Sequence, residues 1–128
     1  MPTHPIVHVE IPAGDLVAAS QFYADVFDWQ IDTSAPSYPQ FQAEGGPGGG
    51  FVTLGQAGDT PVVYKVGEPL VFLGTPDIDA TLASVEAHGG KTILPRTEIP
   101  GIGYWAVFED PTGNRLALYT AGEHAQSS

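Results

Sequence analysis

The clearest signal for the fold in this sequence is the segment Phe108-Glu109-Asp110-Pro111-Thr112-Gly113-Asn114-Arg115-Leu116-Ala117-Leu118-Tyr119. Its centre is rich in turn-forming residues, because proline presets φ, aspartate and asparagine bind their own backbone, and glycine adopts positive φ. The residues before it, 104–108, are aromatic and favour an extended chain. The stretch therefore predicts a β-hairpin. In its second strand one face would carry Arg115, Ala117 and Tyr119, and the other Leu116 and Leu118.

Outward from this hairpin, hydrophobic periodicity predicts two helices. The first covers residues 16–27 with Asp15 as its N-cap, and the second opens within 75–79 and ends at Gly89-Gly90. The segments with strand character are 6–11, 29–31, 38–43, 51–54, 61–66, 70–74, 91–95 and 104–108.

Residues 45–50, five glycines and one proline, predict an irregular loop for most of their length. They do not predict a phosphate-binding loop, since no Lys-Ser/Thr pair and no helix follow.

The order of elements repeats. Ile11-Pro12-Ala13-Gly14-Asp15 aligns with Thr75-Pro76-Asp77-Ile78-Asp79 at a shift of 64 residues, and each copy predicts strand, helix and three short strands. We therefore predict an α+β fold of two βαβββ modules in one domain, 1–128. Module 1 would cover about 5–66, module 2 about 67–120, and a disordered tail 121–128. Each module has a helix for one face of its sheet, so the other module or a ligand must cover the second face.

Composition narrows the range of functions to expect. The net charge of −11 includes seven carboxylates and no Lys or Arg in residues 1–64, so nucleic acid is not an expected partner. An acidic surface favours a cationic ligand, although it also serves solubility. No apolar run is long enough for a membrane span, the first residues lack signal-peptide character, and cysteine is absent. These features predict a cytoplasmic protein.

Several local strings point to one family. They are His8-Val9-Glu10-Ile11-Pro12 with Asp15, Phe22-Tyr23, Val26-Phe27-Asp28-Trp29, Ala87-His88-Gly89-Gly90 and residues 108–114. Together they resemble the vicinal oxygen chelate superfamily, which includes glyoxalases, bleomycin resistance proteins and extradiol dioxygenases. The resemblance implies a cupped mixed sheet with both helices on its outer face, and a homodimer.

The resemblance also implies where a catalytic metal ion would bind in the cup. Of the four family ligand positions, the first falls on His8, the second near 51–54, the third within 70–72 and the fourth on Ala117. Only His8 can ligate, and catalytic zinc sites use about three protein ligands. We expect no metal and no other cofactor, although His8 and Glu10, about 6.6 Å apart on one strand face, could both touch a divalent ion.

His8 and Glu10 are the candidate catalytic residues. His8 could pack or hydrogen-bond in the cup, could bind a ligand or act as a general base with Glu10, or could ligate a metal. Strand faces and aromatic character extend the candidate lining of a small-molecule site. The full set of candidate ligand-binding residues is His8, Glu10, Phe41, Phe51, Tyr64, Trp105, Phe108, Arg115 and Tyr119.

Three functions remain open at this point. The first is a small-molecule binding protein of the antibiotic-resistance type that uses no metal. The second is a metal-dependent lyase, isomerase or dioxygenase with a non-standard site around His8 and Glu10. The third is a non-catalytic interaction module.

Overall fold

The computed structural model describes residues 3–122 and divides into two compact units. The N-terminal unit is Val7–Val71. The C-terminal unit begins at Phe72 and includes the residues up to Ile6. No helix in the described part of the chain is long and apolar enough to cross a membrane.

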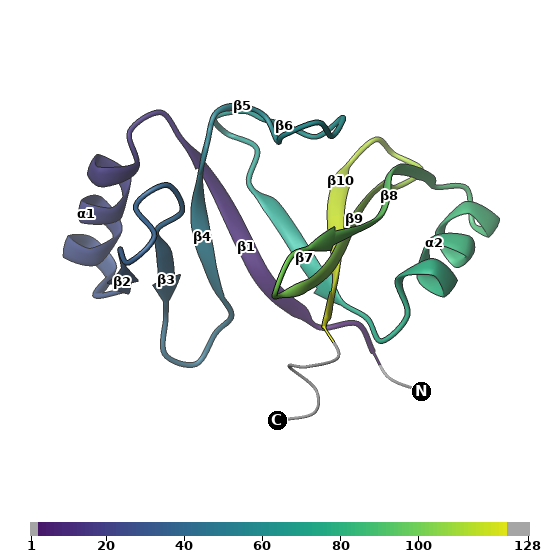
Figure 1. The fold of residues 1–128 in the computed structure, drawn as a ribbon, viewed down its shortest axis with the longest axis horizontal. Helices are drawn as coiled ribbons and strands as arrows, with labels where there is room; N and C mark the ends of the chain where they lie inside the picture. The colour runs from purple at the N-terminus through teal and green to yellow at the C-terminus, as the bar shows by residue number, and fades with distance from the viewer. Residues whose placement is uncertain (1–2, 123–128) are drawn as a thin grey trace. The chain divides into compact units, whose positions relative to one another are not determined.

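The N-terminal unit contains one helix against a mixed sheet (Figure 1). Its strands lie in the order β2-β3-β4-β1, with β1 parallel to β4 and the other neighbours antiparallel. The helix packs against β4 and β2. A separate hairpin, β5 with β6, follows the sheet. The elements are β1 (Ile6–Ala13), α1 (Leu16–Phe27), β2 (Gln30–Asp32), β3 (Gln40–Gln42), β4 (Gly48–Thr53), β5 (Gly55–Gln56) and β6 (Val63–Tyr64).

The C-terminal unit repeats the same plan. Its strands lie in the order β7-β10-β9-β8, with β7 parallel to β10 and the other neighbours antiparallel. Its helix packs against β8, β9 and β10. The elements are β7 (Leu70–Gly74), α2 (Ile78–Ala87), β8 (Lys91–Ile99), β9 (Gly103–Glu109) and β10 (Arg115–Ala121). The predicted α+β class and the repeated βαβββ order are confirmed.

The first helix begins at Asp15, the predicted N-cap, and the second begins at Asp77, within the predicted opening at 75–79. Asp15 Oδ1 accepts a hydrogen bond from the Ala18 amide at 2.9 Å, and Asp77 Oδ1 accepts one from the Ala80 amide at 3.0 Å. Both caps have extended φ and ψ, and each satisfies an amide that has no partner within its helix. The second helix ends before Gly89, whose φ of 93° suits a residue without a Cβ.

The hairpin of β9 and β10 also forms as predicted. Asp110 Oδ1 accepts hydrogen bonds from the amides of Thr112 and Asn114 at 2.8 and 3.0 Å, and Gly113 has φ 99°. The inward face of β10 meets the helix through Leu118, which is buried with Ile78, Leu82 and Ala106. Ala117, on the other face, is also fully buried.

Several predicted strand boundaries are wrong. The first strand continues through Pro12 to Ala13, beyond its predicted end at residue 11. The strand β8 continues past Pro95 to Ile99, with register shifts along its pairing to β9. Ala121 ends β10 instead of opening a tail. The rest of the predicted tail, 123–128 with His124, lies outside the described residues.

The glycine-rich segment is also more regular than predicted, because Gly48, Gly49 and Gly50 form the first half of β4. A Cβ added at Gly49 would come within 1.9 Å of the Val9 carbonyl oxygen. Position 49 of the strand therefore needs glycine for the close approach of β4 to β1. Glycine at this position reflects close packing and does not indicate a loop.

Candidate functional site

Four side chains of the N-terminal unit meet at one polar cluster. His8 and Glu10 lie two residues apart on β1, so they share a face of the sheet. Tyr38 comes from the segment before β3, and Tyr64 comes from β6. We call these four residues the Glu10 cluster.

The Glu10 cluster is connected by hydrogen bonds. Tyr38 donates its hydroxyl proton to Glu10 Oε2 at 2.8 Å, and Tyr64 donates to Glu10 Oε1. His8 Nε2 lies 2.7 Å from the Tyr38 hydroxyl oxygen. With Glu10 ionised, Nε2 carries the proton and donates it to Tyr38. The Tyr38 ring also stacks on the imidazole, with ring centroids 6.4 Å apart.

Burial shifts the titration of both ionisable groups on β1. Glu10 is only 8% exposed. Loss of water around the carboxylate raises its pKa, and the hydrogen bonds from Tyr64 and Tyr38 oppose that rise without cancelling it. Burial lowers the pKa of His8, since a charged imidazole is poorly solvated there. Burial and then the negative charge of Glu10 raise the pKa of Tyr38 and of Tyr64, so both phenols keep their protons.

Glu10 has no cationic partner in the described residues. The ion pairs there join Arg96 to Asp79 and Arg115 to Glu109, both in the C-terminal unit. Residues 7–64 contain no Lys or Arg, and Lys65 is exposed. Two phenolic hydroxyls are therefore what balances this buried carboxylate.

Two glycines of β4 lie opposite the two polar residues of β1. The parallel register pairs His8 with Gly48 and Glu10 with Gly50. Because paired residues face the same side of a sheet, no β4 side chain competes with the Glu10 cluster at these positions. The ring of Tyr38 occupies the space over Gly50 instead.

The predicted site residues of the N-terminal unit fall into two groups. His8, Glu10 and Tyr64 meet, as described above. Phe41 and Phe51 are placed elsewhere: they are buried beside α1, with ring centroids 5.3 Å apart. Phe51 pairs with Ile11, one residue beyond Glu10, so it faces the opposite side of the sheet. Their neighbours in this aromatic core are Tyr23 and Trp29.

The remaining candidates belong to the C-terminal unit. Phe108 packs against the buried cluster beside α2, so it fills that core instead of lining a ligand site. Trp105 stacks on Phe72 with centroids 6.1 Å apart, and Tyr119 lies opposite Trp105 in the strand register. Arg115 is exposed and pairs with Glu109 at 3.3 Å.

The residues at the family's metal positions do not fit a metal ion. The described chain contains no group of three or more His, Cys, Asp or Glu residues that could hold one. Ala117, the position where the resemblance requires an acidic ligand, is fully buried and packs in its sheet.

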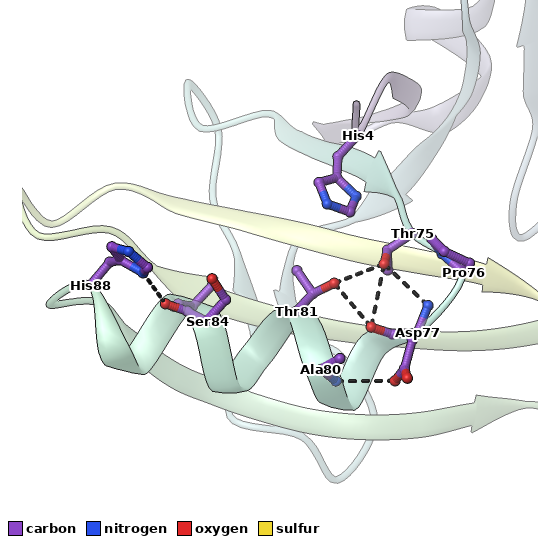
Figure 2. A pocket seen from close by; sticks show the side chains of 9 residues that line it. His4, Thr75, Pro76, Asp77, Ala80, Thr81, Ser84 and His88 are labelled. Atoms are coloured by element: carbon purple, nitrogen blue, oxygen red, sulfur yellow. Dashed lines mark hydrogen bonds between the residues drawn. The ribbon is translucent and has the colours of Figure 1, made fainter. Parts of the chain in front are cut away.

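A hollow of about 510 Å³ lies along α2 in the C-terminal unit (Figure 2). His4 faces the helix there and donates from Nδ1 to the Gly74 carbonyl at 3.0 Å. His88 donates from Nδ1 to the Ser84 carbonyl at 2.8 Å. The carboxylate at its edge, Asp77, caps the helix. The polar groups drawn there thus serve local structure and make no cluster comparable to that of Glu10.

Tyr38 is the site residue that sequence reasoning missed. The sequence places it at the start of a predicted strand, whereas the structure begins β3 at Gln40. The one signal for it is indirect: glycines at alternate positions of a strand leave room for a ring from elsewhere. Using that signal requires the register between β1 and β4, which the sequence does not supply.

Comparison with known proteins identifies the family. The model of the Glyoxalase/Bleomycin resistance protein/Dioxygenase superfamily matches residues 5–118. An anthracycline biosynthesis protein, DnrV of Streptomyces peucetius, is 27% identical over 88% of this chain and 46% of its own length. A glyoxylase-like domain-containing protein of Didymella fabae is 28% identical over 88% of this chain and 90% of its own. The chain thus spans less than half of the Streptomyces relative.

A solved structure supports the fold. A glyoxalase/bleomycin resistance protein/dioxygenase superfamily member from Vibrio splendidus aligns with a TM-score of 0.64 at 15% identity, over 92% of this chain and 99% of its own. At that identity the likeness concerns the fold alone. The family match extends over most of the sequence, so the chain belongs to the glyoxalase/bleomycin resistance protein/dioxygenase superfamily.

Proposed function

We propose that this protein binds a small molecule at the Glu10 cluster without a metal ion, and that the ligand presents a cationic group to Glu10. The observation that carries the proposal is a buried carboxylate that, among the residues the structure describes, is balanced by two phenols and no cation. A buried anion is costly unless it is paired. A cationic ligand would supply the missing charge, and the acidic chain would attract it.

The names of the relatives agree with small-molecule binding. The family description includes bleomycin resistance proteins, and the Streptomyces relative is named for anthracycline biosynthesis. Both names concern antibiotics, so a drug-like cation is a sensible first probe. That this chain itself binds a ligand of that kind is part of the proposal.

The test is calorimetric titration with a panel of aromatic amines and quaternary ammonium compounds, each beside a neutral analogue. We expect cations to bind, and Glu10→Gln to weaken them tenfold or more, because a hydrogen bond to a charged group contributes roughly 1.5–3 kcal/mol. Glu44→Gln, which removes the same charge from an exposed site, is the matched control. Equal affinity in both variants would exclude Glu10 as the recognition group.

One observation favours a second candidate, an enzyme that moves a proton. The chain from Glu10 through Tyr38 to His8 can hold a proton at either end, because each hydroxyl both donates and accepts. The raised pKa of Glu10 makes its carboxylate a stronger base than an ordinary glutamate, which suits a general base. Deuterium uptake from D₂O at the carbon next to a carbonyl of a test substrate, lost in Glu10→Gln, would support this enzyme over the binding protein.

The metal-dependent enzyme remains the third alternative. Elemental analysis of protein purified without chelators distinguishes it, since a stoichiometric divalent ion would favour it. A protein that responds to neither metals nor cations in thermal-shift assays would instead be an interaction module.

A further inference from the structure

We infer that Gly50 is a positioning residue. Because glycine has no side chain, the space over Gly50 forms a seat for the Tyr38 ring, and this seat holds the Tyr38 hydroxyl between His8 and Glu10. The consequence for ligand binding rests on the proposed function, whereas the seat itself can be tested without a ligand.

The seat is visible in the contacts that a side chain would make at Gly50. A Cβ built there would lie 2.3 Å from Cζ, 2.6 Å from the hydroxyl oxygen and 2.7 Å from Cε1 of Tyr38. All three nearest atoms belong to the Tyr38 side chain. Because real Cβ atoms essentially never come within 3.0 Å of a neighbour, alanine at position 50 and the observed Tyr38 ring exclude each other.

The backbone leaves the ring little choice of position. The Tyr38 amide donates to the Ala35 carbonyl at 2.9 Å, and the Phe51 amide donates to the Pro39 carbonyl at 2.9 Å. Pro39 is buried. The first contact closes a turn before Tyr38, and the second holds the main chain directly after Tyr38 against β4. A ring displaced from Gly50 would therefore have to leave the Glu10 cluster.

Neighbouring glycines show that this role is specific to Gly50. At Gly49 the nearest atom to an added Cβ is the Val9 carbonyl oxygen at 1.9 Å, which is backbone and cannot be removed by mutation. At Gly46 an added Cβ meets nothing within 4 Å. Gly50 is thus restricted by a removable side chain, and Gly46 provides a matched control for adding one methyl group.

The first experiment is a double-mutant cycle in urea. Gly50→Ala should lower the unfolding midpoint, and Gly46→Ala should not. In a Tyr38→Ala background, the loss caused by Gly50→Ala should fall to less than half, because the clashing ring is gone. A loss of the same size in both backgrounds would overturn the proposal, since Gly50 would then serve the backbone alone.

The second experiment follows the titration of Glu10 and His8 by NMR, and it separates the seat from the hydroxyl. Tyr38→Phe keeps the ring and removes one hydrogen bond, so the pKa of Glu10 should rise further. Gly50→Ala should displace the ring and admit water, so the pKa of Glu10 should fall toward its ordinary value and that of His8 should rise toward its own. Unchanged titration in Gly50→Ala would also overturn the proposal.

The two proposals fail in different ways. If Glu10→Gln binds cations as well as the parent does, the proposed function fails while the cycle and the titrations still stand. If Gly50→Ala leaves both titrations in place, the seat fails whatever the ligand experiments show. When both hold, Gly50→Ala should weaken cation binding, and Gly46→Ala should not.

Discussion

Glu10 is a buried acid whose partners are two phenols, and this arrangement makes its charge state the most sensitive property of the site. Burial disfavours the ionised form, and each tyrosine hydroxyl favours it. The protonation state of Glu10 is therefore sensitive to small changes in either burial or hydrogen bonding. Substitutions that alter one effect and keep the other should move its pKa in a known direction.

Tyr64→Phe should raise the pKa of Glu10. The variant keeps the ring that excludes water and removes the hydrogen bond that stabilises the carboxylate. The measurement is the titration of the Glu10 carboxyl carbon by NMR. Tyr104→Phe, in the C-terminal unit, is the control and should leave it unchanged. A fall in the Tyr64→Phe variant would mean that the ring had moved and exposed the acid.

Glu10 should also make stability depend on pH with a definite sign. Its folded pKa lies above the ordinary value of 4.5. The folded state therefore binds the proton more tightly, and this contribution is complete below pH 4.5 and is lost as pH rises through the raised pKa. Relative to Glu10→Gln, the parent should lose stability over that range in urea unfolding. A difference that stayed constant with pH would contradict the shift.

Among the secondary elements, the two helix starts offer a matched pair of tests. Asp15→Ala and Asp77→Ala should each lower the free energy of unfolding by about 1 kcal/mol, the usual cost of losing an N-cap. Each substitution leaves one helix amide, of Ala18 or Ala80, without its acceptor. Urea unfolding measures the loss, with Glu44→Ala as the exposed acidic control. Losses no larger than the control would contradict the capping role.

The β9–β10 turn should weaken in acid. Hydrogen bonds from Asn114 and Thr112 lower the pKa of Asp110 from 3.8 to about 2. A lowered pKa stabilises the fold above 3.8, and this contribution is lost as pH falls through 2. The stability difference between the parent and Asp110→Ala should therefore shrink between those values. Amide exchange of Gly113, whose amide donates to the Asp110 backbone carbonyl, reports on whether the turn itself stays closed.

The elements that the sequence predicted correctly carry their own local signals. Asp15 and Asp77 begin helices because their side chains bind amides three residues on, and the turn at 110–114 binds itself. Gly48 to Gly50 carry no such signal. They form a strand because β1 and the rings of Tyr38 and Phe41 surround them, and these contacts come from distant parts of the chain.

The same distinction between local signals and distant contacts explains which residues of the candidate site the sequence predicted. The alternation of β1 placed His8 and Glu10 together, and it is a local property. Phe41 and Phe51 were assigned to a ligand surface on aromatic character alone, whereas the register between β1 and β4 turns Phe51 toward α1. Tyr38 was missed for the same reason, since its place over Gly50 depends on that register.

Across the whole molecule, one plan is used twice with different chemistry on corresponding strands. Strand β1 carries His8 and Glu10, whereas the shift of 64 residues places Phe72 and Gly74 at the equivalent points of β7. The polar site is thus confined to one copy of the repeat. A homodimer and a cytoplasmic location stay predictions of the sequence, and sedimentation velocity tests the first of them.

The affinity for a cationic ligand should follow the ionisation of Glu10, and this prediction joins the site to the charge of the whole chain. Below the raised pKa the carboxyl is protonated, so affinity should rise with pH and level off above that pKa. Salt should weaken binding only in part. The attraction of the −11 chain is screened as the Debye length falls from about 30 Å at 0.01 M to about 3 Å at 1 M, while a buried contact is screened much less. Calorimetry over pH and salt measures both effects, with Glu10→Gln expected to lose the pH dependence and keep the salt dependence. If the parent and Glu10→Gln showed the same pH profile, the ligand would be responding to the surface charge and not to Glu10.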